Sequence, residues 1–195
     1  MGNNLYKELR RSLNAHRYEK DHDTGLAHFP GANLAIGGVF TIEVNGQNPS
    51  SFHNLIVDDW LDTALDILFN AGSVPAGYYI APYANNVSPS GSWDAATFVA
   101  TGGEFTNYDE ATRVEWTPAA SSSGTVTNSA SKAEFTIAAS GDDTIWGAGI
   151  LTNSAKSDTT AGTLVAANKD SAARSGLVDG DVVTITYALT LADNS

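Results

Sequence analysis

Carboxylates are the residues of this chain that are numerous enough to suggest chemistry. A glycoside hydrolase needs two carboxylates that face each other across a cleft. One stretch of the sequence supplies five acidic residues, Asp94, Glu104, Asp109, Glu110 and Glu115, but nothing in their spacing pairs any two of them. The sequence also shows no Ser/His/Asp signature, no phosphate-cradling loop and no Gly-x-Gly-x-x-Gly. We therefore predict no catalytic residues, no cofactor and no enzyme activity.

Two groups of residues have the side-chain types that metal sites use. Three histidines lie six residues apart, with aspartates on both sides of the middle one: His16, His22 and His28, with Asp21 and Asp23. This spacing fits neither one face of a helix nor a known ligand pattern. Asp142–Asp143 and Asp179–Asp181 lack the density of acidic ligands found in calcium loops. We interpret the histidines as solvated loop residues and the aspartates as turn residues, and predict no metal site.

Aromatic rings on a surface can stack on sugars or mark a protein interface. Trp116 and Trp146 lie within strand patterns, which favours core positions. Trp93 stands in the polar loop Ser90–Asp94, so we expect it to be at least partly exposed as a possible surface contact.

The composition limits what can position such residues. The chain has 195 residues, of which 42% are apolar, enough for one domain with a sizeable core and an appendage. It has no cysteine, which excludes disulfides and thiolate metal sites. No apolar run reaches the 18 or more residues of a membrane span, and no apolar region follows the basic N-terminus, as it would in a secretory signal.

The charge is unevenly distributed along the chain. The net charge is −12, yet residues 1–20 carry +3 and residues 21–195 carry −15. Residues 5–18 have a thin apolar seam at Leu5, Leu9 and Leu13, which predicts a short helix that orders only against a partner. Residues 19–35 have turn chemistry and no periodicity. We therefore divide the chain into an extended N-terminal arm, 1–35, and a body, 36–195.

The arm is the predicted partner-binding segment. Its apolar seam and its basic residues supply the contacts that we expect, namely Leu5, Lys7, Leu9, Arg10, Arg11, Leu13, Arg17 and Lys20. The acidic body should repel nucleic acid, so we predict a protein partner for the arm and no nucleic-acid or membrane partner.

A single amphipathic helix is predicted between Asn54 and Gly72. Its apolar stripe follows the helical repeat: Val57, Trp60, Leu61, Ala64, Leu65 and Leu68. Asn54 is the expected N-cap, and Asn70 or Gly72 is expected to take the left-handed conformation at its end. We expect the Trp60 face to pack on a sheet.

The rest of the body has the pattern of short strands separated by turns. The predicted strands are 39–44, 77–84, 97–100, 112–117, 133–139, 144–151, 163–167 and 182–191. Segments 85–93 and 118–128 are interpreted as loops, and 47–53 as a lead into the helix. Pro82 suggests a strand end or edge, and Gly147 and Gly149 suggest close packing or a bulge. The predicted fold is mainly β, a β-sandwich or jelly roll with one amphipathic helix and an extended N-terminal arm.

From Asn54 onward, the order of these features resembles a known family. The helix at Asn54–Asp62 precedes Tyr78-Tyr79-Ile80, and a Glu-rich segment, 104–110, follows. Three further motifs complete the order: Arg113–Trp116, Thr144–Leu151 and Gly180–Leu191. Over residues 37–191 the chain is similar to small virion proteins of tailed bacteriophages, in particular capsid decoration (cement) proteins.

The resemblance implies a structural protein of the virion, made in the host cytoplasm and seated on the outer surface of the capsid. It implies a body that is often a homotrimer and an arm that grips neighbouring subunits of the major capsid protein. Two alternatives remain at this point. One is a tail-fibre, head-fibre or baseplate adaptor, and the other is a carbohydrate-binding module.

Overall fold

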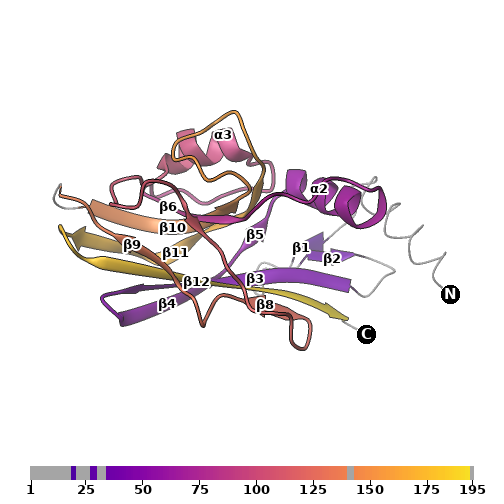
Figure 1. Ribbon diagram of the computed structural model, residues 1–195, viewed down its shortest axis with the longest axis horizontal. Coiled ribbons are helices and arrows are strands. Elements are labelled where there is room, and N and C mark those ends of the chain that lie inside the picture. The colour runs from indigo at the N-terminus through magenta and orange to yellow at the C-terminus, as the bar shows by residue number, and fades with distance from the viewer. Residues whose placement is uncertain (1–18, 21–26, 30–33, 140–142, 194–195) are drawn as a thin grey trace.

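The chain folds as a β-sandwich of two antiparallel sheets, which confirms the predicted fold class (Figure 1). The structure is a computed structural model and describes residues 19–20, 27–29, 34–139 and 143–193. Most of the predicted N-terminal arm lies outside these residues, so the boundary between arm and body stays a prediction.

The first sheet is built on two long strands, β3 (Leu34–Val44) and β12 (Val182–Asp193). They pair in antiparallel register from Val44–Val183 to Leu34–Asp193. The other edge of β3 is shared by β2 (Ala27–Phe29) and β4 (Gln47–His53), and β1 (Glu19–Lys20) extends the sheet beyond β2. The other edge of β12 is shared by β8 (Thr125–Thr127) and β9 (Ala133–Thr136).

The second sheet has the order β5-β11-β10-β6-β7. Its strands are β5 (Leu55–Ile56), β6 (Tyr79–Tyr83), β7 (Val114–Glu115), β10 (Asp143–Leu151) and β11 (Leu164–Leu177). β7 pairs only with Tyr79 and Ile80, and the carbonyl of Pro82 accepts from the Phe105 amide at 2.9 Å. Pro82 has no N–H to donate to a neighbouring strand, and the edge where this donor is missing lies beyond the end of β7. This agrees with the preference of proline for sheet edges.

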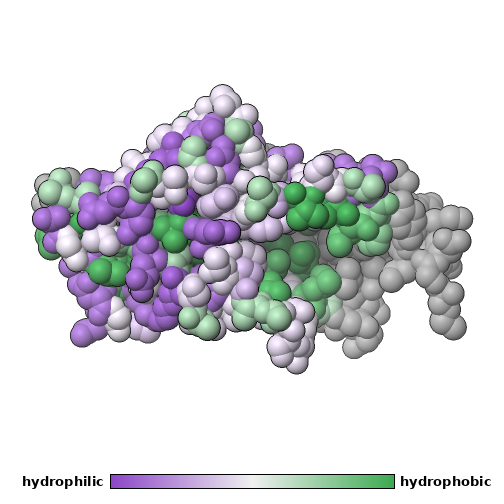
Figure 2. Space-filling view, viewed as in Figure 1, coloured by the Kyte–Doolittle hydropathy of each residue, from purple (hydrophilic) through white to green (hydrophobic). Residues whose placement is uncertain are grey.

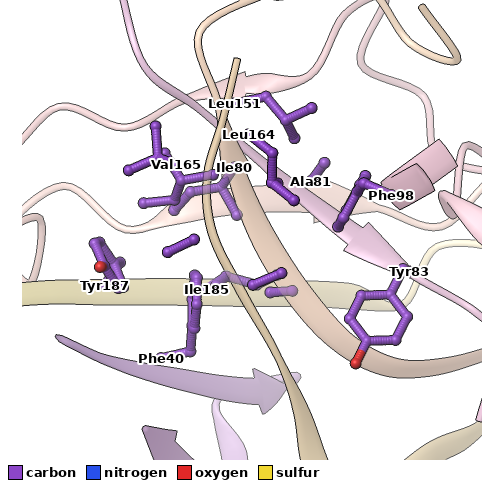
Figure 3. Packing of buried hydrophobic residues seen from close by; sticks show 14 of the residues in the cluster. Phe40, Ile80, Ala81, Tyr83, Phe98, Leu151, Leu164, Val165, Ile185 and Tyr187 are labelled. Carbon is purple, nitrogen blue, oxygen red and sulfur yellow. The ribbon is translucent and has the colours of Figure 1, made fainter. Parts of the chain in front are cut away.

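The main core lies between the two sheets. Phe40, Ile185 and Tyr187 of the first sheet face Ile80 and Val165 of the second, and all five are at most 3% exposed (Figure 3). The alternation predicted for β3, β9 and the first part of β12 is confirmed, because a strand directs every second side chain to one face. At the end of β12 the core no longer covers the strand, and Leu191 is 48% exposed.

A third layer covers the outer face of the second sheet, where Figure 1 shows α3 (Ala95–Thr97) on the side of β6 and β10 away from β12. A π-helix, Phe98–Gly103, continues α3, so the strand predicted at 97–100 is wrong. The Asp94 carboxylate accepts from the Thr97 amide at 2.7 Å and starts a helix instead. Phe98 lies against Gly149, where an added Cβ would be 2.6 Å from the ring, so the predicted close packing at this glycine is confirmed.

Three other segments differ from their predictions because pairing with a distant strand decides them. The lead into the helix, 47–53, forms strand β4, and the predicted loop 118–128 contains β8. β11 is much longer than the predicted 163–167, because its polar second half continues to pair with β10 across register shifts.

The predicted helix is α2 (Asp58–Phe69), which is shorter than expected at both ends. Asn54 is not its N-cap. Asn54 is buried, accepts from the Gly38 amide at 2.6 Å and donates to the Tyr187 hydroxyl at 2.8 Å. At the other end Ala71, not Asn70 or Gly72, takes the left-handed conformation, with φ of 54°. The Trp60 face is buried as predicted, with Trp60 7% exposed.

Candidate functional site

Glu104, one of the five acidic residues considered for catalysis, is buried in an ion pair. Its two oxygens accept from Nε and Nη2 of Arg113 at 2.7 and 2.8 Å, and both side chains are almost fully buried. Arg113 also donates to the Asn153 carbonyl at 2.9 Å, and the Ser157 amide donates to Glu104 at 2.8 Å. This pair holds the 152–163 loop. In the sequence, Arg113 and Glu115 alternate with Val114 and Trp116, which predicts a polar face for Arg113. That prediction is wrong for Arg113, because alternation carries no signal for a buried partner.

Two other acidic candidates also have local roles in folding. The Glu110 carboxylate accepts from the Thr136 amide at 3.1 and 3.2 Å. Asp94 caps α3, and the hydrogen bond from Thr97 lowers the pKa of Asp94. Asp109 and Glu115 are exposed. The geometry gives each engaged carboxylate a structural partner rather than a second carboxylate across a cleft.

Lys156 lies near the Glu104–Arg113 pair and donates to backbone carbonyls. Its Nζ donates to the Tyr108 carbonyl at 2.8 Å and lies 3.5 Å from the centroid of the Tyr108 ring. Partial burial lowers the pKa of Lys156, and burial raises the pKa of Tyr108. Lys156 thus links the 152–163 loop to the segment that contains Tyr108.

The 179–181 segment is a turn, as predicted, whereas Asp143 is the first residue of strand β10 and is not a turn residue. Asp181 accepts from the Val178 amide at 3.0 Å and from Asn45 Nδ2 at 2.9 Å, and these bonds lower the pKa of Asp181. Within the part of the chain that the structure describes, no group of three or more histidines or carboxylates could hold a metal ion. Five of the residues considered as ligands lie outside that part: His16, Asp21, His22, Asp23 and Asp142.

Trp93 is not a surface contact, since it is only 7% exposed. Its ring lies 6.4 Å from that of Tyr83, and a Cβ added at Gly102 would lie 3.2 Å from the Trp93 ring. The polar loop around Trp93 folds over the outer face of the second sheet and places the indole in the third layer. Trp116 is 8% exposed, as predicted, and Trp146 is partly buried against the core.

Exposed large hydrophobic residues gather instead at the end of α2. We call Leu68, Phe69 and Val74 the apolar end of α2; they are 69%, 47% and 70% exposed. The predicted burial of Leu68 is therefore wrong. Figure 2 shows hydrophobic residues over this end of the molecule, close to hydrophilic ones. Exposed apolar patches with a polar rim are typical of protein–protein contacts.

The predicted arm meets the body at the edge of the first sheet. Lys20 lies in β1 opposite Ala27 of β2, and β2 pairs with β3. The other seven residues of the predicted partner-binding segment lie outside the described part of the chain: Leu5, Lys7, Leu9, Arg10, Arg11, Leu13 and Arg17. No helix among the described residues is long and apolar enough to cross a membrane. Comparison with protein-family models, curated proteins and solved structures finds no match for this chain.

Proposed function

We propose that this chain is a structural virion protein that binds the outer surface of a phage capsid and stabilises the lattice of the major capsid protein. The observation that carries the proposal is the apolar end of α2, because exposed hydrophobic residues gathered at one place indicate a protein partner. The order of motifs from Asn54 to Leu191, which resembles that of decoration proteins, names the class of partner.

The arm supplies the second contact in this proposal. Its leucines would lie in a groove on a neighbouring subunit, and its arginines would pair with carboxylates there. β1 and β2 support this role, since they connect the arm to the first sheet by strand pairing. The partners that we propose are the major capsid protein and further copies of this chain, most simply as a homotrimer.

The two alternatives make different use of the same fold. An adaptor of tail fibres, head fibres or the baseplate would have the same sandwich and arm, so location on the particle distinguishes it. A carbohydrate-binding module is less well supported, since Trp93, the aromatic residue expected at the surface, is 7% exposed.

The test is the binding of purified protein to purified capsids and tails, measured by cosedimentation. We expect the full chain to sediment with capsids and to raise the temperature at which the capsids dissociate. Deleting residues 1–20 should weaken binding strongly and leave the circular dichroism spectrum of the body unchanged. Binding to tails alone would favour the adaptor, and binding to neither would contradict the proposal.

A matched pair of variants tests the charges of the arm. Changing Arg10 and Arg11 to Ala should weaken binding to capsids, and the loss should be largest at low salt, where surface charges are least screened. Changing Ala120 and Ser121 to Glu alters the net charge by the same amount in an exposed loop, and binding should be retained. Equal losses in the two variants would mean that net charge, and not the arm, decides binding.

A further inference from the structure

The hairpin of β3 and β4 turns at Asn45–Gly46, which is the single Asn-Gly pair in the sequence. β3 ends at Val44 and β4 begins at Gln47, so these two residues form the whole turn. Their φ angles are 51° and 69°. Both central residues of a type I′ turn need a positive φ, and Asn-Gly is a pair that adopts it readily. The hairpin therefore places a chemically labile pair at an exposed position.

The lability comes from the side-chain amide of asparagine, one of the residues that are least stable to heat. The backbone nitrogen of the next residue attacks the side-chain carbon Cγ and forms an N–Cγ bond, which closes a five-membered succinimide. The Cγ–Nδ2 bond breaks, and the nitrogen leaves as ammonia with the proton of the attacking amide. Water then opens the ring at either carbonyl and gives aspartate or isoaspartate.

Gly46 is a favourable neighbour for this attack. Glycine has no side chain to obstruct the approach of its nitrogen to Cγ. A Cβ added at Gly46 would have no heavy atom within 4 Å, and both residues of the turn are exposed. The surroundings of the reacting atoms are therefore open to water, which is the only co-reactant that the two steps need.

Hydrogen bonds to the start of β12 hold Asn45 away from this reaction in the folded chain. Its Nδ2 donates to Asp181 at 2.9 Å, and its Oδ1 accepts from the Val182 amide at 2.9 Å. The Asn45 amide donates to the Val182 carbonyl at 2.8 Å. Cγ has to turn toward the Gly46 nitrogen before it reacts, so the two side-chain bonds must break first.

We propose that Asn45 is a site of spontaneous deamidation that becomes reactive when the turn at Asn45–Gly46 separates from the start of β12. The product no longer fits the closed turn. The Nδ2 donor becomes a carboxylate oxygen that faces the Asp181 carboxylate, and like charges this close repel. Isoaspartate also adds one carbon to the main chain of a two-residue turn, whose geometry depends on its length.

The modification is thus irreversible and weakens the contact between the β3–β4 hairpin and β12. Each opening of the turn gives a chance of reaction, and a chain that has reacted closes less well. This inference goes beyond the proposed function and does not depend on it, since neither the chemistry nor its test involves a capsid.

The first experiment follows the intact mass and the peptide map of the full chain during incubation in mildly alkaline buffer, with and without urea. Conversion of Asn45 to aspartate and isoaspartate should be about tenfold slower in the folded chain than in urea, because two hydrogen bonds must open first. No conversion in urea, or equal rates in the two states, would overturn the inference.

A matched pair of variants tests whether Asp181 provides the protection. Asp181→Ala should raise the rate in the folded chain toward the rate in urea, since Asn45 loses the acceptor for its Nδ2. Asp179→Ala removes the same charge from the same turn but leaves that acceptor in place, so its rate should match that of the unchanged chain. Circular dichroism shows whether both variants fold. Equal rates in the two folded variants would contradict the inference, and if Asp181→Ala does not fold, the comparison with and without urea decides.

A second set of variants tests the effect of the product on stability. Asn45→Asp should lower the urea midpoint, whereas Gln47→Glu adds the same charge to an exposed residue of the same hairpin and should leave the midpoint nearly unchanged. Asn45→Asp combined with Asp181→Asn should recover the lost stability, because the amide at position 181 then donates to the carboxylate at position 45. Equal midpoints for Asn45→Asp and Gln47→Glu would mean that the product fits the turn, and the inference would be wrong.

Discussion

Removing Arg113 should destabilise the body far more than removing any lysine on its surface. The guanidinium is buried, with side-chain exposures of 0% for Arg113 and 1% for Glu104. In Arg113→Met, Glu104 stays buried and keeps only the hydrogen bond from the Ser157 amide. Breaking a buried pair by removing one partner costs about 3–5 kcal/mol, because the remaining charge is neither solvated nor paired. For a chain of this size that corresponds to a fall in melting temperature of about 6–20 °C.

The control is the exposed pair of Lys132 and Glu43. Its atoms are as close, at 2.7 Å, but its side chains are 37% and 19% exposed. Lys132→Met should therefore cost at most about 1 kcal/mol, since water screens such a pair. The two ion pairs have similar distances but different burial, so the comparison tests the effect of burial on stability.

Urea unfolding, followed by tryptophan fluorescence, measures both variants under one protocol. A double variant, Glu104→Gln with Arg113→Met, should be more stable than the sum of its single changes predicts, because neither charge is then left alone. If Arg113→Met fails to fold, Glu104→Gln gives the same test from the other partner. Equal urea midpoints for Arg113→Met and Lys132→Met would refute the argument, since they would mean that the pair is effectively solvated.

Four further predictions follow from burial, close packing and pKa shifts. Leu61→Ala should cost about 2–5 kcal/mol and Leu68→Ala less than about 0.5 kcal/mol in the same unfolding assay, and equal costs would contradict the open end of α2. Gly149→Ala should cost about 1–3 kcal/mol, measured as a lower melting temperature, because its Cβ would lie 2.6 Å from the Phe98 ring. Burial raises the pKa of Tyr187, so the folded state keeps the phenol protonated and stability should fall as the pH rises above about 10; in Tyr187→Phe the urea midpoint should depend less on pH there. The Thr97 hydrogen bond lowers the pKa of Asp94, so the ionised carboxylate stabilises the folded state above the ordinary aspartate pKa, and this stabilisation is lost as the pH falls through the pKa of folded Asp94. The Asp94→Asn variant should therefore lose less stability on acidification, measured as the urea midpoint.

Much of the sandwich could be predicted from the sequence, because strand alternation is local information. Phe40 and Ile42 lie two residues apart and are both buried, as are Val183 and Ile185. The Asp179–Asp181 turn was also predictable, since Gly180 tolerates its φ of 82° and Asp181 accepts from the chain beside it. The β4 strand was not predictable, because most of its residues are polar and exposed and only pairing with β3 makes them a strand.

The candidate surface was predicted in part. Helical periodicity identified the stripe that contains Leu61 and Leu68, but it could not say where the supporting sheet ends. The same limit applies to Trp93, which stands in a polar loop, and to Arg113, which alternates with apolar strand residues. Their burial depends on Tyr83, ten residues from Trp93, and on the Asn153 carbonyl, forty residues from Arg113.

The sequence alone therefore determined the strand faces, the helix and its stripe, and the separation of a basic N-terminal segment from an acidic body. These follow from spacing and charge, which are properties of neighbouring residues. The tertiary structure alone decided that Glu104 pairs with Arg113, that Trp93 is covered and that Leu68 is open. Each of these depends on which distant segment lies against the side chain, because burial and ion pairing are set by atoms that the local sequence does not contain.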